Sequence, residues 1–67
     1  MLKFAICDDN TRILTKFSEM LENIFTKNNF DASVLFTTDN TKDMLNYISN
    51  NKIDVIILDI NMNSGKS

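Results

Sequence analysis

The residues best suited to chemistry are three aspartates that lie far apart in the chain. Asp8 and Asp9 follow a mostly apolar segment at 3–7, and Asp59 follows the apolar run Val55–Leu58. An aspartate directly after a strand often starts a turn or caps the next helix, which accounts for each residue taken alone. Three carboxylates meeting at one edge of a sheet would repel one another. A hard divalent cation such as Mg²⁺, which prefers oxygen ligands, would relieve that repulsion.

Hydrophobic periodicity predicts the elements that must position these aspartates. Strands are predicted at 3–7, 31–36 and 53–60. Apolar residues at spacings of three and four predict a helix of about 17 residues, which begins after Asn10 and ends near Asn28. A shorter helix, capped by Asn40 or Thr41, is predicted to fade at 50–51. The predicted order is therefore strand, helix, strand, helix, strand.

The third strand indicates how these elements pack. Val55–Leu58 is apolar at four successive positions, which is typical of a strand covered on both faces within a parallel sheet. Right-handed crossovers between the strands then favour an open α/β sheet. Ligands of such sheets bind beyond the carboxyl ends of the strands. If the first and third strands are neighbours, Asp8, Asp9 and Asp59 converge there.

Composition excludes several other classes of protein. A chain of 67 residues allows one small domain with a limited core. The single cysteine, Cys7, excludes an intrachain disulfide, and the lack of histidine excludes a zinc finger. A net charge of −2 argues against direct nucleic-acid binding. No run is apolar for long enough to cross a membrane, and the first residues lack a signal-peptide pattern, so we expect a soluble, cytoplasmic protein.

Two runs, FAICDDN at 4–10 and DVIILDINM at 54–62, resemble the receiver domain of bacterial two-component response regulators. The spacing between them and the order of the predicted elements are also similar. The phrase at 6–9 is further similar to receivers of the accessory-gene-regulator and LytTR-type class. The resemblance implies a flavodoxin-like α/β fold with parallel strand order 2-1-3. It implies that 1–67 is the N-terminal portion of a receiver, truncated before strands four and five.

The resemblance also implies roles for individual residues. Asp59 would be the phosphoacceptor, whose carboxylate attacks a phosphoryl group carried by a sensor histidine kinase. Mg²⁺ would be bound by Asp9 directly, by Asp8 largely through water, by Asp59, and by the backbone carbonyl of Asn61. The implied parent is a transcription regulator that relays a signal. It is not expected to be an enzyme, since it accepts the phosphoryl group on itself.

Two alternatives stay open. A truncated receiver could act as a decoy that binds a kinase through its first helix without signalling, or could be an inert fragment. A Mg²⁺-dependent phosphatase-like hydrolase with Asp59 as nucleophile is disfavoured, because Asn61 stands where such enzymes place a second acid. An incomplete sheet would also leave the edge of the third strand bare, so we expect self-association through that strand.

Overall fold

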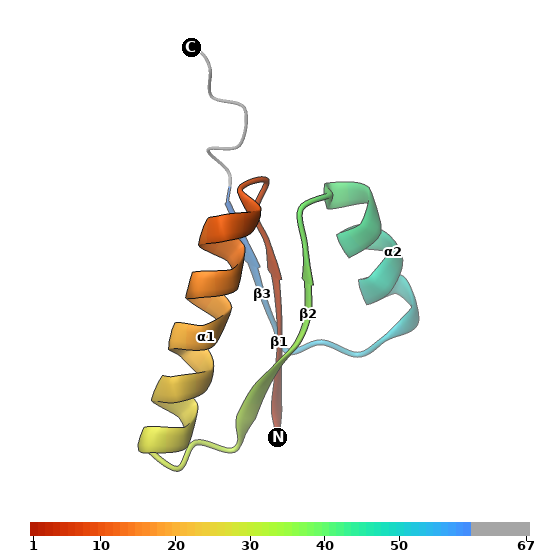
Figure 1. The fold of residues 1–67 in the computed structure, drawn as a ribbon. Helices are drawn as coiled ribbons and strands as arrows, with labels where there is room; N and C mark the ends of the chain where they lie inside the picture. The colour runs from red at the N-terminus through yellow and green to blue at the C-terminus, as the bar shows by residue number, and fades with distance from the viewer. Residues whose placement is uncertain (60–67) are drawn as a thin grey trace.

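The computed structural model describes residues 1–59 of the chain. Its elements are β1 (Leu2–Cys7), α1 (Thr11–Lys27), β2 (Ala32–Thr38), α2 (Thr41–Asn50) and β3 (Val55–Leu58). The three strands form one parallel sheet in the order β2-β1-β3 (Figure 1). The partial α/β fold and the strand order 2-1-3 predicted from the sequence are therefore confirmed.

Asparagine side chains begin both helices. The Asn10 Oδ1 atom accepts the backbone N–H groups of Arg12 and Ile13 at 3.1 and 3.2 Å, and the Asn40 Oδ1 atom accepts that of Asp43 at 3.2 Å. α1 ends at Lys27 with Asn28 as its C-cap, and the following Asn29 adopts the left-handed conformation that commonly closes helices, with φ 55°. Local capping chemistry therefore sets where α1 and α2 begin, and it also helps to end α1.

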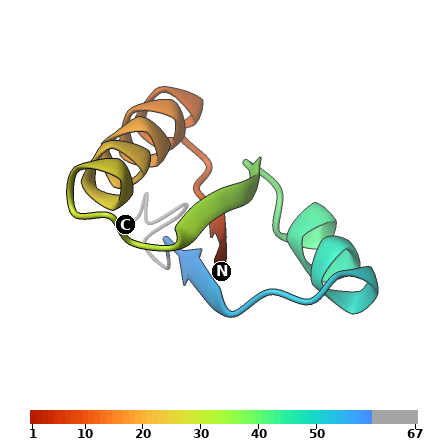
Figure 2. The same ribbon diagram turned by 90° about the horizontal axis from the view of Figure 1, so that it is seen from below.

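The two helices cover opposite faces of the sheet (Figure 2). The ring of Phe25 on α1 lies 4.9 Å from the ring of Phe4 on β1, measured between centroids. Met44 on α2 packs instead with Ala5 and Cys7 of the same strand. Because successive side chains of a strand point to opposite faces, β1 is covered from both sides. It forms the centre of the core, and Ala5 and Cys7 are fully buried.

The strand boundaries differ in part from those that the sequence predicts. β2 continues through Thr37 and Thr38, two residues beyond the predicted end at 36, because these residues pair with Ile6 and Cys7 of β1. Threonine is β-branched and fits a strand despite its hydroxyl group. β3 is shorter than the expected 53–60: it covers Val55–Leu58, and residue 60 lies outside the described part of the chain.

β3 is covered less completely than its apolar run indicates. Ile56 and Leu58 are 40% and 48% exposed, whereas Val55 and Ile57 are half-buried. The register with β1 places Ile56 and Leu58 on the face of the sheet that α2 covers, but α2 packs over β1 and β2. Within residues 1–59, this face of β3 is open.

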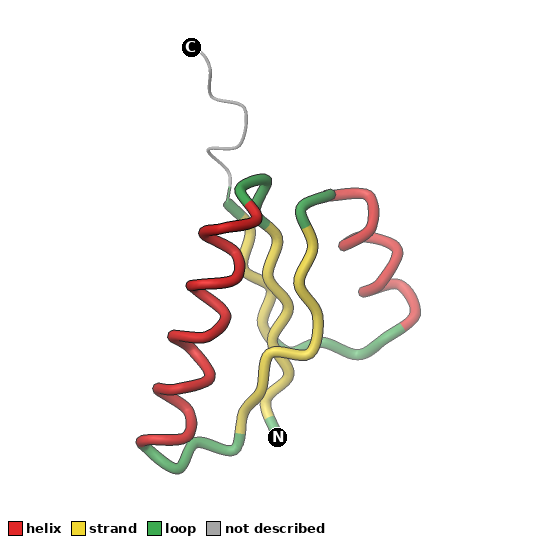
Figure 3. Tube along the Cα trace, in the orientation of Figure 1, coloured by secondary structure: helices red, strands yellow, loops and turns green. Residues whose placement is uncertain are grey.

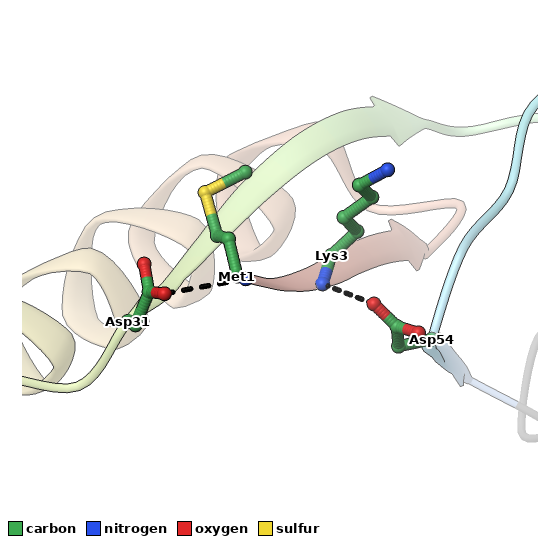
Figure 4. A network of polar contacts seen from close by, with 4 residues as sticks. All are labelled: Met1, Lys3, Asp31 and Asp54. Carbon is green, nitrogen blue, oxygen red and sulfur yellow. Dashed lines mark hydrogen bonds and ion pairs between the residues drawn. The ribbon is translucent and has the colours of Figure 1, made fainter.

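Polar contacts hold together the amino-terminal ends of the three strands (Figure 4). The Met1 ammonium group pairs with the Asp31 carboxylate at 3.2 Å, just before β2. The Lys3 backbone N–H donates to Asp54 Oδ2 at 2.8 Å, just before β3. None of the helices in residues 1–59 is both long and apolar enough to span a membrane.

Candidate metal centre

The carboxyl ends of β1 and β3 bring the three aspartates together. Asp8, Asp9 and Asp59 each offer one carboxylate oxygen, and these oxygens all lie within 4.8 Å of one another. Parallel pairing places Cys7 opposite Leu58, so the residues that follow β1 and β3 lie at the same end of the sheet (Figure 3). The expected juxtaposition of residues separated by about 50 positions is present.

Asp8 also has the local role that its position predicts. Its Oδ1 atom accepts the backbone N–H of Asn10 at 2.9 Å, which closes the turn before α1. The Asp8 backbone N–H donates to the carbonyl of Thr38 at 3.1 Å, which attaches Asp8 to the last residue of β2. A carboxylate offers about four acceptor positions, so one side chain can serve both the turn and a cation.

Asp9 and Asp59 differ in their surroundings. Asp9 lies exposed at the tip of the turn, whereas Asp59 is half-buried at the end of β3. The Asp59 backbone N–H donates to the Cys7 carbonyl at 3.1 Å, so β1 holds its main chain in place. The cluster therefore combines one exposed carboxylate with two that are partly shielded from water.

The donor set fits a hard cation. Carboxylate oxygens are the ligands that Mg²⁺ prefers, and Mg²⁺ usually needs only one or two of them because it retains water or substrate oxygens. Asp8, Asp9 and Asp59 are thus the described residues that could hold Mg²⁺. Asn61, the fourth ligand implied by the resemblance, lies outside the described residues.

Cys7 lies beside this cluster but has the surroundings of a core residue. Burial raises the pKa of its thiol, and the nearby charges of Asp39, Asp8 and Asp9 raise it further, while a hydrogen bond with the Thr41 side chain lowers it. A thiol that is fully buried and kept protonated is a poor metal ligand and a poor nucleophile. Cys7 therefore fills the core beneath the aspartates.

Comparison with known proteins does not identify a family. No protein-family model matches the chain, and neither a curated protein nor a solved structure shows detectable similarity to it. The case for its function therefore rests on the two sequence runs and on the carboxylate geometry that the fold creates.

Proposed function

We propose that this chain is the phosphoacceptor portion of a response-regulator receiver domain, and that Asp59 accepts the phosphoryl group. The observation that carries the proposal is the convergence of Asp8, Asp9 and Asp59 at the carboxyl ends of two neighbouring parallel strands. Open α/β sheets bind ligands at this edge. A carboxylate beside two others that could hold Mg²⁺ suits phosphoryl transfer to aspartate, because the cation would neutralise charge on the phosphoryl oxygens.

The proposed reaction moves a phosphoryl group from a phosphohistidine of a sensor kinase to Asp59. The Asp59 carboxylate oxygen attacks phosphorus, an O–P bond forms as the N–P bond breaks, and the electron pair of that bond returns to the histidine nitrogen. Mg²⁺ held by Asp8, Asp9, Asp59 and the Asn61 carbonyl would neutralise charge on the transferred group. The chain would contribute chiefly by positioning the Asp59 carboxylate, since the Asp59 backbone N–H is hydrogen-bonded to β1.

The proposal also defines the setting of the protein. A sensor histidine kinase would be the partner, the cytoplasm the compartment, and a transcription regulator the parent protein. The net charge of −2 gives this segment no electrostatic attraction for a phosphate backbone, so another part of the parent would contact DNA. The chain would not turn over a substrate, because it is itself modified.

A decoy that binds a kinase without relaying a signal is a second candidate. It is favoured by the apolar stripe of α1, which the sheet covers only in part. Ile13, Met20 and Ile24 are 51%, 48% and 40% exposed, whereas Leu14 and Phe25 of the same helix are buried. An exposed apolar stripe on a surface helix is suited to contact with another helix.

Phosphorylation by acetyl phosphate in the presence of Mg²⁺ tests the proposal. We expect a low yield of a single acyl phosphate, detected by intact-protein mass spectrometry and removed by hydroxylamine. Labelling should disappear in Asp59→Asn and on chelation of Mg²⁺, and it should persist in the control Asp39→Asn. Equal labelling of Asp59→Asn would refute Asp59 as acceptor, and a wild type that binds Mg²⁺ without any labelling would favour the decoy.

A further inference from the structure

Hydrophobicity alone does not select the register of β3. All four side chains of Val55–Leu58 are apolar, so either face of this strand could lie towards α1. A slip of one residue reverses the faces of a strand, and it is strongly opposed only where one face is apolar and the other polar. For β3 a slip would exchange Val55 and Ile57 for Ile56 and Leu58, at little cost in burial. Contacts outside Val55–Leu58 must therefore help to fix the register.

Asp54 provides such a contact at the start of β3. Its backbone N–H donates to the Lys3 carbonyl at 2.9 Å, and its carboxylate Oδ2 accepts the Lys3 backbone N–H at 2.8 Å (Figure 4). The two bonds join one residue to both backbone groups of one residue on β1. The side chains of Val55–Leu58 have no hydrogen-bonding atoms and cannot replace this attachment.

We infer that Asp54 is a positioning residue, which fixes the register of β3 on β1 and thereby places Asp59 beside Asp8 and Asp9. From Asp54 the pairing runs through Phe4 with Val55 to Cys7 with Leu58, and it ends at the bond from the Asp59 N–H to the Cys7 carbonyl.

A slip at one end would be transmitted to the other. Each residue of a strand advances by about 3.3 Å and alternates in face, so a slip of one would move Asp59 along β1 and turn its side chain to the opposite face. The carboxylate oxygens of the cluster, now within 4.8 Å of one another, would separate. The role of Asp54 in fixing the register is argued from the hydrogen bonds alone, and only its consequence for Mg²⁺ binding rests on the proposed function.

Three variants test this inference in the full chain. Asp54→Ala removes the acceptor, Asp54→Asn keeps an amide oxygen in its place, and Asp31→Asn removes an exposed carboxylate at the same end of the sheet without touching β3. Amide hydrogen exchange would be read at Lys3, whose amide donates to the Asp54 side chain, and at Asp59, whose amide reports on the far end of the β1–β3 pairing. The Asp8 amide, which bonds to Thr38 of the other strand pair, is the internal reference.

In Asp54→Ala we expect the Lys3 and Asp59 amides to exchange about tenfold faster relative to the Asp8 amide, the size expected for one hydrogen bond to a charged group. In Asp54→Asn and Asp31→Asn, the exchange rates of these two amides relative to the Asp8 amide should stay as in the wild type. Titration with Mg²⁺ should show weaker binding to Asp54→Ala and recovery in Asp54→Asn.

Two exchange results would overturn the inference: an unchanged exchange rate of the Asp59 amide relative to the Asp8 amide in Asp54→Ala, even if the Lys3 amide exchanges faster, or an equal acceleration at all three amides, which would indicate general destabilisation. A failure of the proposed function would give a different result from a failure of this inference. If the relative exchange rates change as expected but the wild type binds no Mg²⁺, Asp54 still sets the register and the metal centre is refuted.

Discussion

Replacing Asp9 with asparagine should stabilise the protein in the absence of metal. Asp9 is the exposed member of the cluster, and asparagine has nearly the same shape without the charge. One of its carboxylate oxygens lies within 4.8 Å of an oxygen of each of the other two carboxylates. Removing one charge therefore removes two of the three pairwise repulsions within the cluster.

The size of the effect follows from Coulomb's law. At 4.8 Å two unit charges repel by about 1 kcal/mol at the dielectric constant of water, and by about 3.5 kcal/mol at an effective constant of 20. The lower value applies because Asp9 is exposed and salt screens exposed charges. We therefore expect Asp9→Asn to raise the free energy of unfolding by about 1–2 kcal/mol in chelator at low ionic strength.

Mg²⁺ should narrow or reverse this difference. A ligand that binds only the folded state stabilises it by about 2.7 kcal/mol when its concentration is 100 times the dissociation constant. The wild type should gain this stability, and Asp9→Asn, which has lost a ligand, should gain less. Urea melts with chelator and with Mg²⁺ would measure both effects, with Glu19→Gln as the control for loss of one exposed charge away from the cluster.

Two results would contradict this prediction: a lower stability of Asp9→Asn than of the wild type in chelator, or equal stabilisation of Asp9→Asn and Glu19→Gln by Mg²⁺. The first result would mean that the three carboxylates do not repel one another in the folded state, and the second that Asp9 is not a metal ligand.

Three further predictions concern stability and association. Glu22→Ala should lower the free energy of unfolding by about 1–3 kcal/mol in urea melts, because the Glu22 carboxylate accepts two part-buried hydrogen bonds from β2 at 2.7 and 3.0 Å. The exposed control Glu19→Ala should change it by less than about 0.5 kcal/mol, and equal effects of the two variants would contradict this role of Glu22. Burial raises the pKa of the Cys7 thiol above its ordinary value of 9.0, so the folded state holds that proton more tightly than the unfolded state. Stability should therefore fall as the pH rises above about 9, and the fall should be less steep in Cys7→Ala, with identical slopes contradicting the assignment. Light scattering should detect self-association of the wild type in concentrated solution through the open edge of β3, and Ile56→Lys should reduce it, whereas a stable wild-type monomer would exclude this association.

Much of this fold can be predicted because its signals are local. Asn10 and Asn40 mark the starts of the helices, since a side-chain amide oxygen can satisfy the first free N–H groups wherever it precedes a helix. The spacing of apolar residues predicts the length of α1, and the aspartates after the first and third strands indicate the site. The residue types of the candidate centre can therefore be identified from the sequence alone, although Asn61 lies outside the residues that the structure describes.

Other features depend on neighbours that the local sequence does not specify. By its sequence pattern Asp54 is one more residue of the third strand, and only the alignment of β1 with β3 reveals that it bonds to Lys3. Its signal is a polar side chain at the start of an entirely apolar run. Thr37 and Thr38 are polar enough to indicate a connection, and only their pairing with β1 makes them part of a strand.

The order of the elements and the three carboxylates can be predicted from local sequence, because capping and periodicity act within a few residues of the chain. Which apolar residues are buried, and where β3 lies on β1, depends on the tertiary structure. Leu14 is buried while Ile13 is exposed on the same helix, and Leu58 is exposed at the end of an apolar strand. Burial and register depend on which surfaces meet, and the 4.8 Å cluster of carboxylates exists only once they have met.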